Sequence, residues 1–298
     1  MTELDGLIIK STGGFYYVEC GGSVYECRAR GIFRKEGISP LVGDIVKIAA
    51  DGSSGTVAAI HPRRNCLERP PLANIDRLVI TASVCQPPPD LLGIDKLTAI
   101  AEHKGIEPVL VFTKDDISPA DELVRLYRRA GFAAFAVSSK TGDVPPELAA
   151  LLSCGVSAFT GNSGVGKSSL LNRLAPGLGL EVGAVSRRLG RGRQTTRTVE
   201  LFKFGEGYVA DTPGFSSLDI ARSQVILAPD LQYAFRDFAP YIEKCRFTGC
   251  PHLKGEGCAV LEAVKTGEIA ASRHASYCAM YDEVKDIKSW ELKKPGAR

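Results

Sequence analysis

The sequence predicts a multidomain α/β protein in which an N-terminal β-barrel precedes a doubly wound sheet and a C-terminal helical part. Three observations carry this prediction. Glycine turns separate short apolar segments over the first 60 residues, strand and helix patterns alternate from about residue 75 to about residue 220, and cysteines crowd the last third. At roughly 150 residues a domain, the 298 residues suggest two or three domains. We expect them to span residues 1–68, 69–222 and 223–298.

Composition excludes several classes of protein. Apolar residues make up 44% of the chain and charged residues 24%, which argues against disorder and against a fibrous repeat. No apolar run approaches the roughly 18 residues that cross a bilayer, and the first residues lack the pattern of an export signal. We therefore expect a cytoplasmic protein with no membrane segment. The 37 basic and 34 acidic residues give a charge of +3, so net charge alone does not indicate a nucleic-acid partner.

The first domain is expected to be a five-stranded barrel of the OB type. Gly-Gly pairs at 13–14 and 21–22 and an Asp-Gly pair at 51–52 place turns between its short segments, and no helical period intervenes. The expected strands are residues 7–9, 15–18, 24–27, 44–48 and 56–60.

Basic residues gather at one loop of this barrel, residues 30–35. Arg28, Arg30, Arg34 and Lys35 offer a surface on which a phosphate backbone could dock. A solvated charged loop explains the same residues equally well, so both interpretations stay open.

The second domain follows a connector at residues 61–74 that contains three prolines. Beyond it, the pattern is that of βαβ units in a doubly wound sheet. The expected strands are residues 78–84, 108–113, 133–137, 157–160, 199–204 and 208–211, and the expected helices are residues 91–103, 120–130 and 166–174.

A phosphate-binding loop joins one of these strands to one of these helices. Residues 161–168 read G-N-S-G-V-G-K-S and match G-x-x-x-x-G-K-[ST] in the strand–loop–helix context that the motif requires. Glycine lets backbone N–H groups surround phosphate oxygens, Lys167 neutralises the terminal phosphates and Ser168 offers its hydroxyl to Mg²⁺. The candidate nucleotide-binding residues here are Gly161, Asn162, Ser163, Gly164, Val165, Gly166, Lys167, Ser168 and Ser169.

Two further segments have the residue types that respond to a γ-phosphate. Asp211 and Gly214 form a D-x-x-G motif at the end of a predicted strand, where a carboxylate reaches the Mg²⁺ shell and a glycine contacts the γ-phosphate. The polar stretch 191–197 contains Gln194, Thr195 and Thr196, and either threonine could close over Mg²⁺ in the triphosphate state.

Base recognition is expected from residues that precede the phosphate loop. A carboxylate at Asp116 would accept hydrogen bonds from N1–H and the 2-amino group of guanine, and adenine has neither donor there. Lys114 would lie along the base plane with its aliphatic stem. The candidate residues are Thr113, Lys114, Asp115 and Asp116, with Ser138, Ser139 and Lys140 supporting the guanine 6-oxygen.

The order of these motifs is reversed from that of ordinary GTPases. The base-reading motifs at 113–116 and 138–140 come before the phosphate loop at 161, an order that resembles a circularly permuted GTPase. Permutation preserves a site when the old termini lie close together. The segment after Gly214 then leads directly into the C-terminal domain, so the covalent chain itself could transmit the nucleotide state.

A cysteine-rich cluster in the C-terminal domain predicts a structural zinc site. The spacing C-x4-C-x-H-x5-C supplies three thiolates and one imidazole, a complete tetrahedral set. The alternative is a group of reduced free thiols. The candidate ligands are Cys245, Cys250, His252 and Cys258, whereas Cys278 looks spare and Cys20, Cys27, Cys66, Cys85 and Cys154 are expected to be buried thiols.

Helices are expected over residues 261–265 and 277–290. Basic side chains in this region could contact an RNA backbone, although each alone is more often part of a solvated face. They are Arg273, His274, Lys285, Lys288, Lys293 and Lys294.

The succession of an OB-type barrel, a permuted GTPase and this cysteine cluster resembles the bacterial ribosome small subunit-dependent GTPase A family over nearly the whole chain. The resemblance implies a GTPase that uses Mg²⁺, contains one structural Zn²⁺ and assists late maturation of the 30S subunit. It also implies contact with 16S rRNA through both flanking domains and hydrolysis stimulated by the subunit. We expect the chain to act as a monomer without a membrane partner.

Two residues depart from the usual GTPase pattern. Thr113 stands where most GTPases have asparagine, so a hydroxyl replaces the usual amide link to the phosphate loop. Phe215 stands where many have a glutamine that orients water. Members of the family usually carry histidine at the position of Gln194, and our hypothesis is that Gln194 orients the attacking water once RNA contact orders residues 187–197.

Two other functions remain open at this point. One is an RNA-binding assembly scaffold whose guanine nucleotide site is structural and never hydrolyses its ligand, which Phe215 and Gln194 keep possible. The other is an ATP-dependent enzyme, for which Lys167 and Ser168 would serve equally well but against which Asp116 argues.

Overall fold

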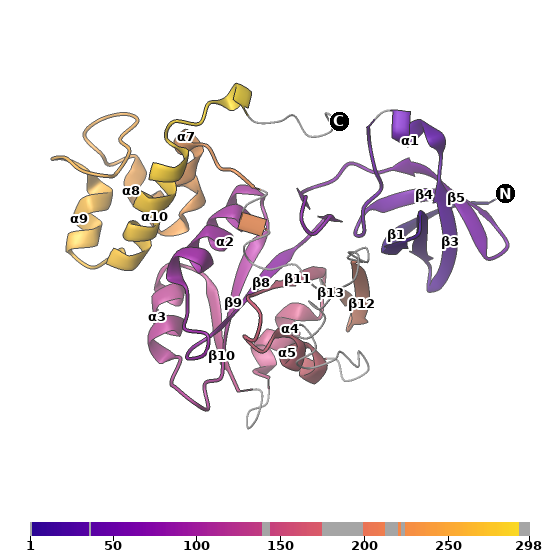
Figure 1. Ribbon diagram of the computed structural model, residues 1–298, viewed down its shortest axis with the longest axis horizontal. Coiled ribbons are helices and arrows are strands. Elements are labelled where there is room, and N and C mark those ends of the chain that lie inside the picture. Colours follow the sequence, from indigo (N-terminus) through magenta and orange to yellow (C-terminus); the bar gives the residue numbers. More distant parts are fainter. Residues whose placement is uncertain are drawn as a thin grey trace, which may run out of the picture.

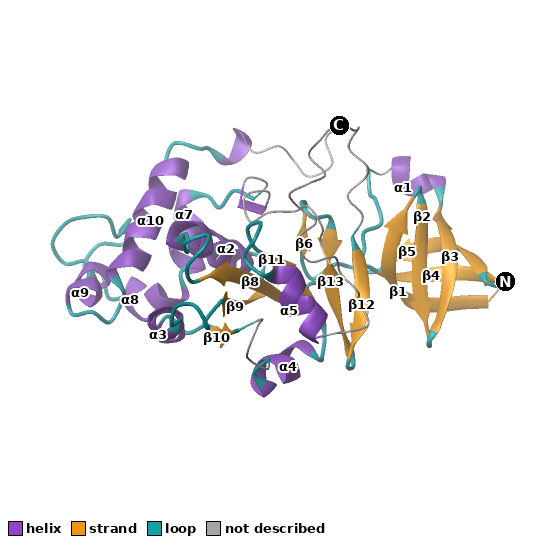
Figure 2. Cartoon of the chain, turned by 60° about the horizontal axis from the view of Figure 1, so that its bottom comes forward, coloured by secondary structure: helices purple, strands orange, loops and turns teal. Residues whose placement is uncertain are grey.

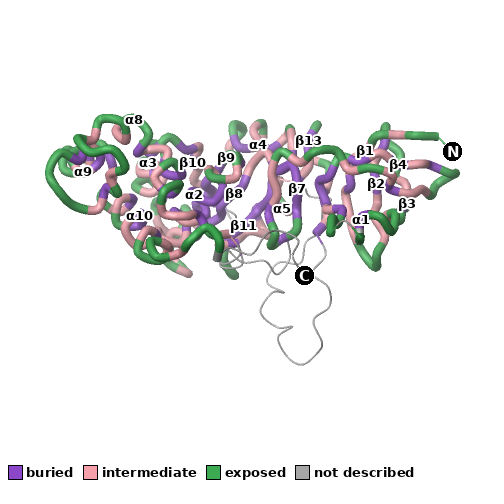
Figure 3. The backbone as a smooth tube through the Cα atoms, turned by 90° about the horizontal axis from the view of Figure 1, so that it is seen from above, coloured by how far each residue is buried: buried purple, intermediate pink, exposed green. Residues whose placement is uncertain are grey.

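The computed structural model describes residues 2–35, 37–138, 144–174, 199–211, 220–221 and 224–291. Three parts lie in a row: a barrel at one end, a sheet flanked by helices in the middle and a group of short helices at the other end (Figure 1). Buried residues run through the centre of the barrel and the central sheet (Figure 3).

The first part is the expected OB-type barrel. Strand β1 pairs with β2 and β4, β2 with β3, and β5 closes the barrel between β3 and β4. Its interior is apolar because alternate residues point inward, and Ile8, Val18 and Ile48 are fully buried. The strands are β1 Thr2–Thr12, β2 Phe15–Cys20, β3 Ser23–Ala29, β4 Ile45–Asp51 and β5 Ser54–Ile60 (Figure 2).

A short helix, α1 Gly31–Lys35, lies where we expected only a loop. The sequence could not indicate this helix, because its 5 residues are too few to show a helical period.

The connector to the second part is fixed by side-chain contacts. It contains a two-stranded pair, β6 Cys66–Leu67 and β7 Leu72–Ala73. Arg63 Nε donates to Asp44 Oδ1 at 2.7 Å, and the Asp44 side chain is fully buried. Asn74 Nδ2 donates to the Gly43 carbonyl at 2.8 Å. These hydrogen bonds therefore fix the connector, residues 61–74, against the barrel.

The second part is a doubly wound sheet, as predicted. Its strand order is β10-β9-β8-β11-β13-β12, in which the first five strands are parallel and β12 runs antiparallel to β13. These strands are almost continuously apolar because helices cover both faces of a parallel sheet. They are β8 Arg77–Ser83, β9 Glu107–Thr113, β10 Ala133–Val137, β11 Val156–Thr160, β12 Glu200–Phe204 and β13 Gly207–Asp211.

Helices flank this sheet on two sides. The helices are α2 Leu91–His103, α3 Asp121–Arg129, α4 Pro146–Leu152 and α5 Lys167–Leu174. Leu148 of α4 and Leu170 of α5 pack with Val79 and Phe159 in one core cluster, whereas α2 and α3 contribute to the other. Helix α4 was not expected from the sequence.

The barrel and the central sheet form one hydrogen-bonded sheet. Strand β1 of the barrel pairs antiparallel with β12, where Lys10 lies opposite Glu200. The same two residues form an ion pair, with Lys10 Nζ 2.9 Å from Glu200 Oε2. We did not expect this pairing, because it joins segments 190 residues apart and neither carries a local signal for it.

The third part consists of short helices around the cysteine cluster. They are α7 Ala228–Leu231, η3 Gln232–Ala234, η4 Arg236–Phe238, α8 Ala239–Ile242, α9 Ala259–Lys265, α10 Ala271–Val284 and η5 Ser289–Glu291. Helix α10 begins six residues before the start we expected and ends before Trp290.

A buried arginine fastens this third part to the central sheet. Arg273 of α10 is fully buried, and its guanidinium lies 2.7 Å from Asp95 Oδ1 of α2 and 2.8 Å from Asp237 Oδ1 of η4. Tyr127 of α3 also donates to Asp95 Oδ1, at 2.9 Å. Beside this network, Arg236 pairs with Glu107 at 2.8 Å.

The expectation that Arg273 and His274 face RNA was therefore wrong. The buried Arg273 guanidinium pairs with two carboxylates, and His274 Nε2 lies 2.7 Å from the His252 carbonyl. Lys285 pairs with Asp282 at 2.9 Å on the surface. Lys293 and Lys294 lie outside the described residues.

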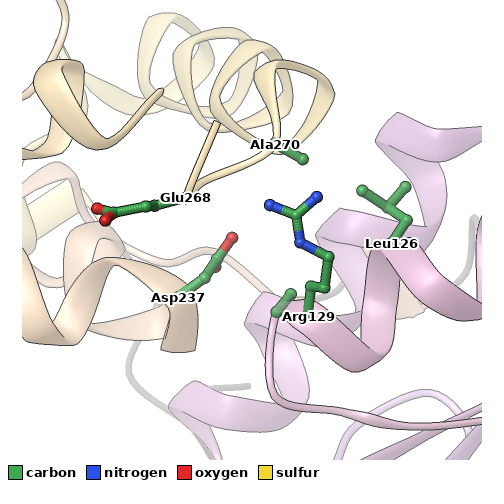
Figure 4. A pocket seen from close by; sticks show the side chains of 6 residues that line it. Leu126, Arg129, Asp237, Glu268 and Ala270 are labelled. Carbon is green, nitrogen blue, oxygen red and sulfur yellow. The ribbon is translucent and has the colours of Figure 1, made fainter. Parts of the chain in front are cut away.

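A small pocket opens at the seam between the second and third parts (Figure 4). Arg129 of α3 reaches across it toward Asp237, and its guanidinium donates to the Gly267 carbonyl. Glu268 and Ala270 line the opposite wall. The pocket belongs to the interface that the Arg273 network holds together.

The isolated cysteines are less uniform than we expected. Cys20 and Cys27 are buried, and burial raises the pKa of both thiols. Cys66 and Cys85 are half-buried. Cys154 is exposed, so the expectation of a buried thiol was wrong there, because it lies in the turn between α4 and β11 rather than in a strand. Within the described part of the chain, no helix is long and apolar enough to cross a bilayer.

The Arg273 network predicts a large effect of one substitution. Arg273→Met would leave Asp95 and Asp237 buried without a cation, so we expect it to lower the free energy of unfolding by about 3–5 kcal/mol. Urea titration of the protein measures this. Lys285→Ala, which removes an exposed pair, is the control and should change the free energy of unfolding by less than about 1 kcal/mol. An Arg273→Met protein as stable as this control would contradict the role assigned to Arg273.

Candidate functional site

The sequence motifs meet at one edge of the central sheet. Strands β10, β9, β8, β11 and β13 are parallel, so their carboxyl ends lie on the same side. The residues predicted to read the base follow β9 and β10, the predicted phosphate loop follows β11, and Asp211 ends β13. Ligands of open α/β sheets bind in the crevice at such an edge. The reversed motif order along the chain therefore does not separate the motifs in space.

The phosphate loop has the backbone that its glycines allow. Gly164 and Gly166 have φ angles of 79° and 93°, which other residues rarely adopt. A Cβ atom on Gly161 would lie 2.5 Å from the Thr81 carbonyl oxygen, so only glycine fits beside β8. Helix α5 begins at Lys167 and directs its first N–H groups toward the loop. Asn162, Ser163, Ser168 and Ser169 lie in the same loop and first turn.

Thr113 joins the base-reading strand to the phosphate loop. Its side chain is buried, and its hydroxyl donates to the Val165 carbonyl inside the loop, with the Ala82 carbonyl a second acceptor at 3.3 Å. Gly166 lies against the same side chain, since a Cβ there would be 3.6 Å from Thr113 Oγ1. A hydroxyl thus makes a link between the two halves of the site.

The residues after Thr113 form a tight turn. Lys114 has a φ of 64°, and its ammonium group donates to the Gln86 carbonyl in the loop after β8. Asp115 Oδ1 accepts from the Ala120 N–H at 2.8 Å and so fixes the approach to α3. Asp116 is exposed at the tip of the turn, where its carboxylate is accessible to a base. Ser138 is buried directly after β10.

Several candidate residues lie outside the described part of the chain. For Asp211 the structure describes the backbone at the end of β13 but not the side chain. The undescribed candidates are Ser139, Lys140, Gln194, Thr195, Thr196 and Gly214.

The four predicted metal ligands come together in the third part. One ligand atom from each of Cys245, Cys250, His252 and Cys258 lies within 4.8 Å of the others. His252 Nδ1 is 3.5 Å from Cys245 Sγ and 3.5 Å from Cys258 Sγ, and these two sulfur atoms are 3.9 Å apart.

These separations fit a tetrahedral zinc ion. Bonds of about 2.3 Å to sulfur and about 2.0 Å to nitrogen place sulfur and nitrogen about 3.5 Å apart, and two sulfur atoms about 3.8 Å apart. Cys245 and Cys258 form no disulfide bond at a sulfur separation of 3.9 Å, and Cys250 is also a free cysteine. The donor set of three thiols and one imidazole is one of those that structural zinc sites use.

The backbone and the protonation of the cluster also suit a metal. His252 has a φ of 55°, an uncommon conformation for a residue with a side chain. Burial, with a smaller contribution from the charge of His274, lowers the pKa of His252 and favours the neutral imidazole that coordinates metals. Burial raises the pKa of the Cys258 thiol to about 12, so a bound cation is needed to hold it as a thiolate.

Sequence reasoning missed the groups that support these sites. The Gln86 carbonyl beside Lys114 is a backbone atom, and no side-chain pattern could indicate it. Gln232 lies 20 residues from His252 in the sequence and contacts its ring at 2.8 Å. Arg273, interpreted from the sequence as a surface cation, is the largest fully buried side chain among the described residues.

Two family models match this chain, one in the barrel and one in the central sheet. A model of the RsgA GTPase family matches residues 60–221, and a model of the RsgA N-terminal domain matches residues 5–57. A protein of Shouchella clausii named small ribosomal subunit biogenesis GTPase RsgA is 43% identical over 95% of this chain and 98% of its own length. Its namesake from Caldanaerobacter subterraneus is 42% identical, with 96% and 97% covered.

Solved structures have the same architecture. The crystal structure of YjeQ from Thermotoga maritima is similar with a TM-score of 0.82 and 32% identity, and the match covers 96% of this chain and 100% of that one. The structure of YloQ, described as a circularly permuted GTPase, is similar with a TM-score of 0.79 and 36% identity, and 96% of each chain is covered.

The contact between Thr113 and Val165 predicts how nucleotide affinity depends on one hydroxyl. Thr113→Val leaves the Val165 carbonyl without its donor, so we expect GDP affinity to fall by about 5- to 150-fold, the equivalent of about 1–3 kcal/mol. Thr113→Ser keeps the hydroxyl and should bind GDP nearly as well as the wild type. Equilibrium titration with a fluorescent GDP analogue measures this, and wild-type affinity in the valine variant would contradict the link.

Proposed function

The chain belongs to the RsgA GTPase family, and from this membership we propose that it hydrolyses GTP to GDP and phosphate while assisting late maturation of the 30S ribosomal subunit. We further propose that docking on the subunit and its 16S rRNA stimulates hydrolysis. The chain would act as a monomer in the cytoplasm, with domains at residues 1–68, 69–222 and 223–298.

One observation carries this proposal: the phosphate loop and the base-reading turn lie at the same sheet edge and are joined through Thr113. Only β8 lies between β9 and β11, so the two elements are separated by about 10 Å, twice the usual strand spacing. A single nucleotide then contacts both, with its base on one side of β8 and its phosphates on the other.

The proposed nucleotide contacts follow from this placement. Backbone N–H groups of the loop and the start of α5 would hold the β-phosphate, and Lys167 the terminal phosphates. The Ser168 hydroxyl would bind Mg²⁺, and the Asp211 carboxylate would reach the coordination shell of this ion, which neutralises charge on the phosphates. Thr195 or Thr196 and Gly214 would contact the γ-phosphate end.

Asp116 makes guanine the proposed base. Its exposed carboxylate offers two acceptors, which suit the two N–H donors on that edge of guanine. An adenine nucleotide would leave the carboxylate without these partners. Lys114, Asp115, Ser138, Ser139 and Lys140 would complete the base side of the site.

Gln194 is our proposed water-orienting residue, because Phe215 cannot bind water in the usual position. The stretch of residues 187–197 has five arginines and no acidic residue, a composition that suits docking on RNA phosphates. RNA contact would then bring Gln194 to the γ-phosphate, which explains why hydrolysis by the free protein is expected to be slow.

Both flanking domains have groups that suit RNA. In the barrel, the Arg28 guanidinium lies over the Phe15 ring, 4.6 Å from its centroid. In the third part, the Phe247 ring is 60% exposed and the Arg246 guanidinium lies 5.5 Å from its centroid. The Phe15 ring is half-buried, whereas an exposed ring such as Phe247 can stack on an unpaired base. We also propose one structural Zn²⁺ held by Cys245, Cys250, His252 and Cys258, which would fix the loop that carries Phe247.

Single-turnover GTP cleavage, with and without purified 30S subunits, tests the function. We expect subunits to raise the rate of GTP cleavage by about 10-fold or more. Their RNA would bring Gln194 to the γ-phosphate, much as an activating protein completes the active site of other GTPases. Gln194→Ala should lose most of the stimulation without losing GDP affinity, and Gln194→His should keep it.

The alternatives predict different results in the same assay. Nucleotide binding without cleavage under either condition would favour the structural-site scaffold. Equal rates with and without subunits would contradict stimulation, and competition of ADP with GDP at similar concentrations would favour the ATP-dependent alternative.

A further inference from the structure

The imidazole of His252 is held from the side opposite the thiols. Its Nδ1 atom faces Cys245 Sγ and Cys258 Sγ, each at 3.5 Å. Its Nε2 atom lies 2.8 Å from Oε1 of Gln232, in the short helix η3. An imidazole that uses one nitrogen for a metal carries its proton on the other nitrogen, and a partner for that N–H fixes the ring.

The orientation of the Gln232 amide follows from its second contact. Gln232 Nε2 donates to the Pro229 carbonyl at 3.3 Å. A carbonyl oxygen can only accept, so the amide NH₂ group must face Pro229 and the amide oxygen must face His252. The His252 Nε2 atom therefore carries the proton, and Nδ1 presents a lone pair to the thiols.

From this geometry we propose that Gln232 is the positioning residue of the metal centre. By accepting from Nε2–H, it selects the tautomer whose Nδ1 coordinates the metal, and it holds the ring in the plane that points at the ion. This inference rests on the proposed zinc site and assigns a role to a residue outside its four ligands.

Other contacts of His252 do not perform this task. His274 Nε2 approaches the His252 carbonyl at 2.7 Å and so holds the backbone. The Phe238 ring meets the imidazole edge-on, with 6.1 Å between centroids, and limits its movement without contacting a nitrogen. Of these three neighbours, Gln232 alone distinguishes one tautomer from the other.

The position of Gln232 links the metal to the interface with the central sheet. Helix η3 packs against α2 and is followed by η4, which carries Arg236 and Asp237. These residues make the ion pairs to Glu107 and Arg273. Gln232 therefore connects the proposed metal centre to the segment that docks the third part on the second.

Metal affinity of the full chain tests the proposal. Apo protein is titrated with Zn²⁺ against a chromogenic chelator, and with Co²⁺, whose visible absorption reports tetrahedral thiolate coordination. We expect Gln232→Leu to weaken affinity for both ions by about 10- to 100-fold. Gln232→Glu keeps an acceptor for Nε2–H and should stay within about 3-fold of the wild type.

Two controls separate this role from its premise. Tyr233→Leu changes the neighbouring exposed residue of the same helix and should leave affinity unchanged. Cys258→Ser removes a ligand and should alter the Co²⁺ spectrum, whereas the spectrum of Gln232→Leu at saturation should keep its tetrahedral form.

The possible results divide as follows. Unchanged affinity in Gln232→Leu, an equal loss in Gln232→Glu, or an equal loss in Tyr233→Leu would overturn the role of Gln232 while the zinc site stands. Wild-type protein that takes up neither ion would overturn the zinc site, and this inference with it.

Discussion

The parallel register of the central sheet is the constraint on which the proposed chemistry depends. Five strands end at one edge, so groups that are far apart in the sequence, and in reversed order, become neighbours there. Circular permutation changes which loops connect the strands but not the edge at which they end. The hydrogen bond from Thr113 to Val165 then couples the base turn to the phosphate loop across β8.

The third part is attached to the central sheet by a buried ion-pair network. Arg273 pairs with carboxylates from both parts, and a buried cation of this kind tolerates little displacement because either carboxylate would lose its partner. The barrel is attached differently, through the pairing of β1 with β12 and the ion pair between Lys10 and Glu200. Strands β12 and β13 form a hairpin between residues 191–197 and residues 211–214, the two segments proposed to contact the γ-phosphate. Because β1 pairs with β12, the barrel contacts this hairpin.

Local signals determined how much of the fold could be predicted from the sequence. Helix α2 was predicted over residues 91–103 from its apolar pattern, and the structure shows that Asp90 caps it by accepting from the Gly93 N–H at 3.0 Å. Strand β10 and the closed barrel were also predicted, since glycine turns delimit them. Helix α10 began earlier than expected because residues 271–276 are mostly polar and show no apolar period, although Arg273 and Ser276 among them are buried.

The candidate sites divide in the same way. The phosphate loop and the metal ligands are contiguous motifs, and the structure brings each set together as their spacing indicated. Gln232 and the β1–β12 pairing depend on contacts between distant segments, which no local pattern encodes. In the proposed function, Asp116 and Lys167 bind opposite ends of one guanine nucleotide.

Competitive binding of GDP and xanthosine diphosphate to Asp116→Asn tests this claim most directly, because the asparagine amide can donate to the 2-oxo group of xanthine but meets a donor at the 2-amino group of guanine. We expect GDP affinity to fall by about 100-fold or more and xanthosine diphosphate to become the better ligand. Unchanged GDP affinity and no gain for xanthosine diphosphate would contradict it.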